Sequence, residues 1–467
     1  MKAAFVNSHL RTETFYGISA HLDAECYWIS TGDPDWVSFL ESKKVPRERI
    51  LDLAFAYGDE DTDLDAVLEM EKHSAFKASA MIMSDRLLRH KSREKAYSYI
   101  SSVYKMIKQF ITDNNIDVVF GESTWTAELA ASAAAEKCGI PFLTPATTRI
   151  PNGRFTFFKG FFQDKLFMEK PVFDSDLEAA EEFYDRFVNH RPVPDYAHIK
   201  RDFSLFSGEN LRKFKKHLTY VMFHRDKDMT RPDLDYLFDQ RIFRRNNAKR
   251  LKRLGLSRDI SFLKGQKYCV YNLHMQPEAS IDVLGSYNSD QFHIIQNIAR
   301  SLPADAVVVV KEHPQAVGDR VREFYNAVND LPNAVLVHPE SDNWELTAGA
   351  FAVVTVSGTA AYQAALLGTP SVVFSDVFFA ELPLVYRCRS QEDLPDVLKK
   401  CMDSDRNPDR AACTAFLAKL IKNSFEGSVY GREVSDGNVQ EANFKAAAKG
   451  FNSVLSYIKS ENPTVIR

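Results

Sequence analysis

The stretch KEHPQ, residues 311–315, follows four consecutive valines and could carry chemistry. A run of valines predicts a strand buried on both faces, and Pro314 predicts its end, because proline cannot donate to a ladder. His313 is therefore expected at the end of a parallel strand, where its imidazole can donate a hydrogen bond to a phosphate or nucleotide. The alternative interpretation is a satisfied polar group with no ligand.

A second stretch, VVTVSGTAAYQAALLGTPSVVF (residues 353–374), predicts a buried strand that runs directly into a helix of small residues. The turn contains Ser357, Gly358 and Thr359. Free N–H groups and the helix dipole suit a phosphate, glycine allows close approach, and the hydroxyls add donors. The alternative is that Ser357 or Thr359 only caps the helix.

A polar loop follows the first strand of the same half, in YNLHMQPEASIDVLGSYNSDQ (residues 271–291). It carries His274, Gln276, Glu278 and Asp290. These side chains could contact a reacting sugar or ribose hydroxyls, and the alternative is a hydrogen-bonded loop without a ligand.

The N-terminal half has its own polar strand ends, FGESTWTAE and TTRIPNGR. Glu122 is a candidate general base, and Arg149 and Arg154 could hold a carboxylate or phosphate. Either feature could equally be an inter-domain salt bridge. The acidic run DEDTD, residues 59–63, is interpreted as a helix start, so no metal site is predicted.

Alternating strands and helices must position these residues. From residue 268 the chain shows short β-branched runs separated by stretches with helical spacing: YCVYNL, AVVVVK, NAVLV, FAVVTV and PSVVF. Uninterrupted apolar strands predict a parallel sheet covered by helices on both faces. The N-terminal half repeats the pattern with AAFVN, a long helix around 92–114, DVVFGE, a small-residue helix and IPFLTP.

The predicted organisation is an α/β fold with two Rossmann-type domains facing across a cleft. The N-terminal Rossmann-like acceptor domain spans residues 1–159, a mainly helical connector 160–262, the nucleotide-sugar domain 263–424, and a tail with a helix 425–467. A ligand is expected where the carboxyl ends of both sheets line the cleft.

Composition narrows the class of protein. The 467 residues have a formal net charge of -4, which gives no general reason to expect nucleic acid. Six scattered cysteines without zinc spacing indicate reduced, mostly buried thiols of a cytoplasmic protein, and no signal peptide or membrane span is expected. The basic run RIFRRNNAKRLKRLG (residues 241–255) could meet anionic lipid or a phosphorylated acceptor, or be a solvated helix face.

The motifs HMQPEAS, KEHP and SGTAAYQAALLGTPSVVF, with FGE and RIPNGR upstream, resemble the bacterial capsule polysaccharide biosynthesis family, which includes Kdo transferases. The resemblance covers residues 268–376 and, more faintly, 117–158. It implies a GT-B-like fold and a glycosyltransferase. Because the sequence places no DxD-like acidic pair in the cleft, metal-independent transfer without a cofactor is predicted. Its donor would be a nucleotide sugar, with a CMP-linked ulosonic acid (Kdo or a nonulosonic acid) favoured, and its acceptor a surface glycan or glycolipid.

Carried over by residue, the resemblance implies the following roles. His313 contacts the nucleotide phosphate, and Ser357, Gly358 and Thr359 hold it from the helix start. Gln276 and Glu278 lie near the donor sugar, and Glu122 lies near the acceptor. Beside these roles, Lys311 is predicted to bind the nucleotide sugar, and Arg149 and Arg154 to contact the acceptor or a carboxylate. Gln363 departs from the pattern, because such proteins typically carry a glutamate there to grip ribose hydroxyls.

Two alternatives stay open at this point. One is a nucleotide-sugar epimerase of the same fold, which needs no polymer acceptor. The other is a non-catalytic scaffold in a glycan assembly complex, for which Gln363 is the supporting feature. Peripheral contact with the inner membrane or with glycan assembly proteins goes with the transferase interpretation. Donor, acceptor, linkage, stereochemistry and oligomeric state do not follow from the sequence.

Overall fold

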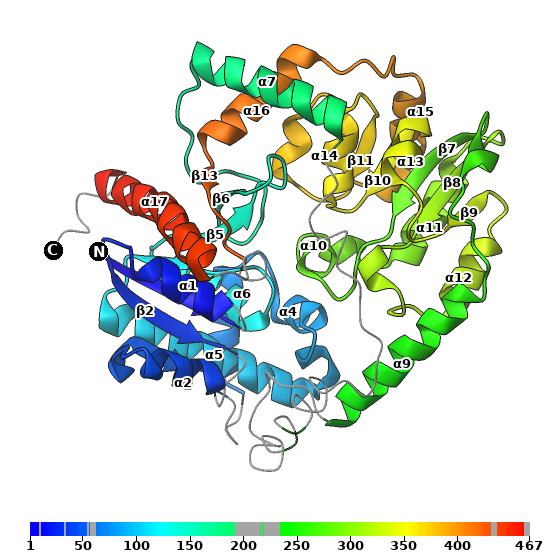
Figure 1. Ribbon diagram of the computed structural model, residues 1–467. Coiled ribbons are helices and arrows are strands. Elements are labelled where there is room, and N and C mark those ends of the chain that lie inside the picture. Colours follow the sequence, from blue (N-terminus) through cyan, green and yellow to red (C-terminus); the bar gives the residue numbers. More distant parts are fainter. Residues whose placement is uncertain are drawn as a thin grey trace. The chain divides into compact units, whose positions relative to one another are not determined.

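The computed structural model divides the chain into two compact units (Figure 1). It describes residues 1–8, 11–31, 34–53, 56, 62–191, 215, 218, 234–430 and 437–461. Unit 1 comprises Met1–Pro171, Thr219–Asp233 and Leu420–Arg467, and unit 2 comprises Val172–Leu218 and Leu234–Lys419.

Unit 1 contains a seven-stranded sheet with the order β13-β6-β5-β4-β1-β2-β3. Its strands are β1 (Lys2–Asn7), β2 (Glu25–Ser30), β3 (Ile50–Asp52), β4 (Val118–Phe120), β5 (Phe142–Thr147), β6 (Arg154–Lys159) and β13 (Phe425–Glu426). Its helices are α1 (Arg11–Ser19), α2 (Pro34–Ser42), α3 (Leu64–Lys72), α4 (Ala78–Ser84), α5 (Arg93–Asn114), α6 (Thr126–Lys137) and α17 (Gly437–Glu461). Strands β1 to β5 pair in parallel, while β6 and β13 pair antiparallel at one edge.

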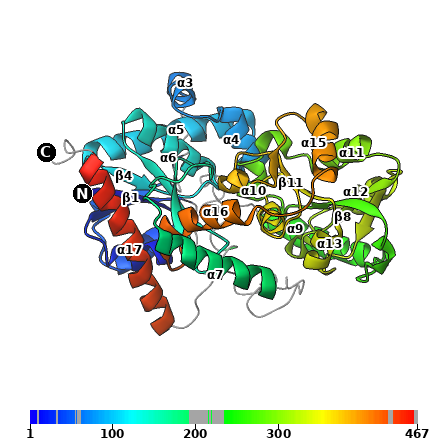
Figure 2. The same ribbon diagram turned by 90° about the horizontal axis from the view of Figure 1, so that it is seen from above.

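The core of unit 1 is aromatic and depends on the C-terminal helix. The α17 residues Ala447, Phe451, Val454, Leu455 and Ile458 are buried, at the three- and four-residue spacing of one helix face. The ring of Phe451 lies within 4.8 to 6.4 Å of five other phenylalanine rings, which are those of Phe5, Phe15, Phe120, Phe155 and Phe157. Figures 1 and 2 both show α17 beside the N-terminal strand and helix. The side chains of α17 therefore complete the hydrophobic core of the first sheet.

Unit 2 contains a six-stranded parallel sheet with the order β12-β11-β10-β7-β8-β9. Its strands are β7 (Lys267–Asn272), β8 (Ala306–Lys311), β9 (Ala334–Val337), β10 (Ala352–Thr355), β11 (Ser371–Val373) and β12 (Val385–Arg387). Its helices are α7 (Asp174–His190), α9 (Leu234–Lys252), α10 (Ala279–Asp282), α11 (Gln291–Ser301), α12 (Arg322–Asn329), α13 (Asn343–Gly349), α14 (Thr359–Leu366), α15 (Leu394–Met402) and most of α16 (Arg410–Lys422).

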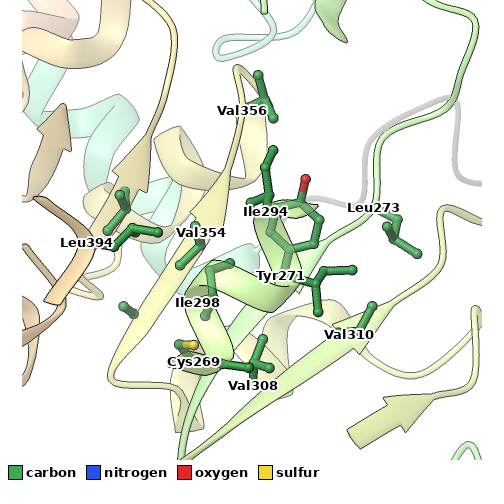
Figure 3. Packing of buried hydrophobic residues seen from close by; sticks show 14 of the residues in the cluster. Cys269, Tyr271, Leu273, Ile294, Ile298, Val308, Val310, Val354, Val356 and Leu394 are labelled. Atoms are coloured by element: carbon green, nitrogen blue, oxygen red, sulfur yellow. The ribbon is translucent and has the colours of Figure 1, made fainter. Parts of the chain in front are cut away.

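The core of unit 2 is mainly aliphatic. Alternate residues of neighbouring strands, such as Cys269, Val308 and Val354, pack against the Ile294 and Ile298 side chains of α11 (Figure 3). The buried aromatic residues of this core are Tyr271, Tyr325 and Phe374, and the hydroxyl oxygen of Tyr271 lies on the side of Val356. Burial on both faces explains why these strands read as uninterrupted apolar runs.

The predicted fold class is confirmed: the chain is α/β, with two Rossmann-like sheets as in GT-B-like proteins. The cleft between the domains stays a prediction.

The observed units divide the chain differently from the predicted boundaries at 159, 262 and 424. Helix α7, expected in a connector, packs in unit 2 through a bond of 3.0 Å from Tyr184 Oη to the Leu366 carbonyl. The expected tail contributes β13 and α17 to unit 1, because their apolar side chains are needed to cover its sheet.

Other predictions concern single segments. Most of the connector, and residues 59–61 of DEDTD, lie outside the described residues, but Asp63 caps α3 by accepting a bond of 3.0 Å from Ala66 N, as the predicted helix start requires. The six cysteines are unpaired, with four buried and two half-buried. Among the described helices, none has the length and apolarity to cross a bilayer.

Candidate functional site

Strand order reverses in unit 2 between β7 and β10, with β8 and β9 on one side and β11 and β12 on the other. Loops after β7, β8 and β10 leave the same edge of the sheet, and the loops on either side of the reversal diverge. In sheets of this kind the ligand occupies that point. Glu312 and Val356 stand directly after β8 and β10, and His274 is the second residue after β7.

His274 is buried at this point and holds the loop after β10. Its Nε2 accepts a hydrogen bond of 3.1 Å from Val356 N and lies 2.8 Å from Thr355 Oγ1. Because Val356 N can only donate, Nε2 carries no proton and the neutral ring has its proton on Nδ1. Burial, assisted by the nearby His313 and Arg320, lowers the pKa of His274 to about 3. The imidazole is therefore neutral at physiological pH.

The bond from His274 fixes the start of α14. Thr355 Oγ1, next to the imidazole, accepts a bond of 3.1 Å from Gly358 N, the cap residue of that helix. A Cβ at Gly358 would lie 2.6 Å from Thr355 Oγ1, so the close approach requires glycine. Thr359 begins the helix and Gln363 follows one turn later, both half-buried. The first N–H groups of α14 have no partner within the helix and suit an anion.

Ser357 forms a hydrogen bond within the protein, and its phosphate contact stays a prediction. Its hydroxyl donates a hydrogen bond of 2.5 Å to the carbonyl of Ser280. The Ser280 hydroxyl donates in turn to Glu278 Oε2 at 2.7 Å. Ser357 thus connects the turn before α14 to the loop after β7, and brings Glu278 into the same neighbourhood.

Gln276 is held within its own loop. Its Nε2 donates to Asp282 Oδ1 at 2.7 Å and to the Ser289 carbonyl at 3.3 Å, and its Oε1 accepts from Gln291 at 3.0 Å. Asp290 caps α11 by accepting from His293 N. For these two residues the structure shows the hydrogen-bonded loop that was the alternative interpretation.

A buried ion pair explains why a core strand ends in charged residues. Glu312 accepts two bonds of 2.7 Å from Arg320 Nη1 and one of 2.7 Å from Tyr325 Oη. Arg320 also donates at 2.5 Å to the carbonyl of His274, so it ties the loop after β7 to the loop after β8. Sequence reasoning missed Arg320 and Tyr325. The available signal was a carboxylate two residues after a run of four valines, since a buried charge needs a partner.

His313 and Lys311 lie on either side of Glu312. His313 is half-buried, and its Nδ1 accepts a bond of 3.2 Å from Gln315 N at the start of a short 3-10 turn, so the neutral ring has its proton on Nε2. Pro314 begins that turn, as predicted. Lys311 is buried with the end of β8, and burial, offset in part by Glu312 and Asp342, lowers the pKa of its amine to about 8.

Unit 1 has a matching point where the order reverses between β1 and β4. Arg11 begins the helix after β1, and its guanidinium forms an ion pair with Glu122, which follows β4. The guanidinium carbon lies 4.4 Å from the centre of the Tyr430 ring. The predicted candidate base is therefore held by an arginine that sequence reasoning did not select.

Glu128 lies near this pair and is fully buried at the start of α6. Its Oε2 accepts backbone bonds of 2.7 Å from Thr124 and 3.1 Å from Trp125. Burial, reinforced by the Glu122 carboxylate and opposed in part by these bonds and by Arg11, raises the pKa of Glu128 to about 8. Its position as the third residue of a small-residue helix was not singled out from the sequence.

The two predicted carboxylate contacts of unit 1 differ from each other. Arg154 lies on β6 and donates to the Ser424 hydroxyl and carbonyl at 2.8 Å and to the Ile421 carbonyl at 3.3 Å. These bonds hold the C-terminal segment against the sheet. Arg149 is exposed, and its guanidinium carbon lies 6.0 Å from the centre of the Tyr430 ring. Arg149 and Arg11 therefore contact the same tyrosine.

The part of the chain that the structure describes contains no group of three or more His, Cys, Asp or Glu side chains suited to a metal ion. Metal-independent transfer stays a prediction.

No protein-family model matches this chain, and no curated protein matches it. Solved structures do match. The UDP-GlcNAc 2-epimerase of Methanocaldococcus jannaschii is 12% identical, covering 90% of this chain and 98% of that chain with a TM-score of 0.28.

Two further matches come from Thermosulfurimonas dismutans. Its KpsC β-Kdo 2,7 transferase is 11% identical, covering 75% of this chain and 89% of that chain with a TM-score of 0.33. Its KpsC β-Kdo 2,4 transferase is 13% identical, covering 70% and 87% with a TM-score of 0.34. The solved structures that this chain resembles thus include two kinds of enzyme, Kdo transferases and UDP-GlcNAc 2-epimerases.

Proposed function

We propose that this protein is a glycosyltransferase that moves a sugar from a nucleotide-activated donor to a bacterial surface glycan or glycolipid. A CMP-linked ulosonic acid, Kdo or a nonulosonic acid, is the favoured donor, because the motifs around His313 and Ser357 to Thr359 resemble those of the capsule polysaccharide biosynthesis family.

The observation that carries this proposal is the start of α14 at the reversal point of the unit 2 sheet. A neutral imidazole, that of His274, fixes the turn through Val356 N and Thr355 Oγ1. Because these side chains fix the turn, the first N–H groups of α14 are preorganised and can bind an anion without rearrangement. A nucleotide phosphate has the charge and size for this position.

In the proposed reaction, the bond between the sugar and the phosphate oxygen breaks, and negative charge grows on the leaving phosphate. The α14 N–H groups, the Thr359 hydroxyl and His313 would stabilise that charge. Gln363, one turn into α14, would donate to a ribose hydroxyl as a neutral group.

The acceptor hydroxyl must lose a proton as it attacks, and Glu122 is the proposed base, with Glu278 as the second choice. Glu122 forms an ion pair with Arg11, and Glu278 accepts a bond from Ser280. Replacing each glutamate by glutamine separates the two: the base is the residue whose loss lowers kcat with little change in donor KM.

Nucleotide binding is the first test. The melting temperature is measured with saturating CMP, CDP, UMP, UDP and GDP, because a ligand that binds the native state raises it. A shift with CMP alone supports the ulosonic acid donor and leads to transfer assays with CMP-Kdo. A shift with UDP instead points to a different donor or to the epimerase reaction, which an assay without acceptor then detects. No shift with any nucleotide favours the scaffold.

His313→Ala tests the phosphate contact. A charge-assisted contact contributes roughly 1.5 to 3 kcal/mol, so nucleotide affinity should fall about tenfold to 150-fold. His338→Ala is the matched control, because His338 also precedes a proline after a strand and only accepts a turn bond of 3.0 Å from Glu340 N. Equal nucleotide affinity in both variants would remove His313 from the site.

Peripheral membrane contact is part of the proposal. The basic run lies on α9 and just beyond it, where Lys249, Arg250, Lys252 and Arg253 are exposed. Cosedimentation with phosphatidylglycerol vesicles, but not with phosphatidylcholine vesicles, is expected to fall when Lys249, Arg250 and Arg253 are changed to glutamate. Unchanged sedimentation would leave the run as a solvated helix face.

A further inference from the structure

Unpartnered polar atoms gather at the reversal point of the unit 1 sheet. Three buried side-chain atoms there have no hydrogen-bond partner among the described residues: Asn7 Oδ1, Arg11 Nη1 and Glu128 Oε1. Asn7 and Glu128 are 0% exposed and Arg11 is 6% exposed. Leaving buried polar groups without partners costs free energy, so their concentration at one point indicates a group that binds there.

The strand order brings the three residues to the same edge of the unit 1 sheet. Phe5 of β1 is in register with Phe120 of β4, so the ends of these strands carry Asn7 and Glu122 side by side. Arg11 reaches back from α1 to pair with Glu122. The charges of both Arg11 and Glu122 act on the Glu128 carboxyl.

The remaining contacts fix these side chains in position. Asn7 Nδ2 donates to Thr12 Oγ1 at 3.0 Å, which leaves its oxygen for another donor. The Arg11 guanidinium is stacked on the ring of Tyr430, which restrains its plane. Glu128 Oε2 is occupied by two backbone N–H groups, so Oε1 is the oxygen that remains.

We propose that the carboxyl end of β1 and β4 is a binding site for an acidic sugar, in which Arg11 binds a carboxylate or phosphate and Asn7 and Glu128 bind hydroxyl groups. The site supplies one cationic donor and two oxygen atoms, which is the complement of a hydroxylated acid. The inference rests on the proposed function, because it makes the acceptor an anionic glycan.

The charge of Glu128 gives the site a pH dependence. The charged groups that act on this carboxyl are Glu122 after β4 and Arg11 on α1. Asp85 accepts a bond of 3.0 Å from Thr126 N at the start of the same helix. Arg86 lies against the neighbouring Trp125 ring. A protonated Glu128 is neutral and can donate from Oε1, whereas the ionised form repels a bound anion. Acid binding should therefore weaken as pH rises from 7 to 9.

The test uses the full-length protein without nucleotide and three matched probes: glucose, glucuronate and glucose 6-phosphate, titrated by calorimetry or by ligand-observed NMR. At least one acid is expected to bind tenfold or more tighter than glucose, and the better of the two acids identifies carboxylate or phosphate as the anion. Equal binding of glucose, or no binding of either acid, overturns the proposal.

Arg11→Gln should reduce acid binding at least tenfold, and Arg11→Lys should retain part of it. The matched control is Arg49→Gln, because Arg49 also pairs with a glutamate, Glu25, and lies 5.7 Å from the Tyr27 ring centre, away from the site. Unchanged acid binding in Arg11→Gln overturns the proposal. If both Arg11 variants fail to fold, Glu128→Gln decides: it should abolish the pH dependence of acid binding between 7 and 9, and a retained dependence counts against the site.

These results are independent of the nucleotide test. Arg11-dependent acid binding without any nucleotide shift supports this site and rejects the proposed donor. A nucleotide shift without acid binding rejects this site alone.

Discussion

The two sheets reverse their strand order at corresponding points, yet the residues at those points differ in their hydrogen bonding and protonation. In unit 2 the His274 imidazole is neutral and Glu312 is fully bonded by Arg320 and Tyr325. In unit 1 the ion pair of Arg11 and Glu122 lies beside the buried Glu128, whose carboxyl has a pKa raised to about 8 and is therefore mostly protonated at pH 7. The side-chain bonding at the same topological position therefore differs between the two sheets. In unit 2 it fixes the turn before α14, and in unit 1 it places an ion pair beside a protonated carboxyl.

The largest expected effect concerns the aromatic core of unit 1. Phe451→Ala removes a ring that contacts five others, so the free energy of unfolding should fall by about 3 to 5 kcal/mol. Urea unfolding measures the loss. The control is Tyr457→Ala on the same helix, since Tyr457 is 37% exposed. If Phe451→Ala loses no more stability than Tyr457→Ala, the Phe451 ring does not belong to the core, and unit 1 does not depend on an aromatic cluster.

Removing the His274 imidazole should have the next largest effect. His274→Ala leaves Val356 N and the Thr355 hydroxyl without their partner, at a cost of roughly 1 to 3 kcal/mol for each buried group. A fall in melting temperature with loss of nucleotide binding is expected. His274→Gln keeps a hydrogen-bond acceptor, so it should recover part of the melting temperature and part of the nucleotide binding. A variant with full stability but no nucleotide binding would show that the fixed turn alone does not bind the nucleotide.

The two points should respond to pH in opposite directions. The pKa of His274 is lowered in the folded state, so the unfolded chain binds the extra proton and stability is lost as pH falls from 6.5 towards 3. The pKa of Glu128 is raised, so the unfolded chain releases its proton first and stability is lost as pH rises from 4.5 to about 8. Each group contributes about 1.4 kcal/mol per pH unit within its window.

Urea unfolding from pH 4 to pH 9 checks this contrast. His274→Gln should flatten the acid side of the profile and Glu128→Gln the alkaline side. Equal profiles for both variants and the unmodified protein would mean that neither group is perturbed by its surroundings.

The smallest expected effect is at Ser357. Ser357→Ala removes one hydrogen bond to Ser280, which contributes about 1 kcal/mol, and nucleotide affinity should change less than twofold. Thr359→Val should weaken nucleotide binding more than Ser357→Ala does, because Thr359 begins α14. The reverse order would restore Ser357 to the proposed phosphate contacts.

Much of the fold was predictable from local pattern. The five apolar runs from residue 268 match β7 to β11, and the long helix predicted around 92–114 is α5. These elements were visible because burial on both faces leaves uninterrupted β-branched runs. Five strands were not predicted: β2, β3 and β6 of the first sheet, and the short β12 and β13. The tail was misjudged because the apolar face of α17 indicates burial but not which sheet it covers.

The candidate site was predictable only where one segment contains the whole signal. The turn at Gly358 and the strand end at His313 could be found by their local sequence. The bond from Val356 N to His274 joins residues 82 apart, and the pair of Arg11 and Glu122 joins residues more than 100 apart. Such partners depend on strand order, which a single sequence does not specify.

The return of the chain to its first sheet has a consequence for biosynthesis. Residues 1–171 leave the ribosome before residues 437–461, so their core lacks Phe451 until that later segment has been made. Residues 234–419 contain every strand of the second sheet and can close their own core during translation. The half that is synthesised first is thus the half that matures last, and until then its exposed phenylalanines are a natural substrate for chaperones.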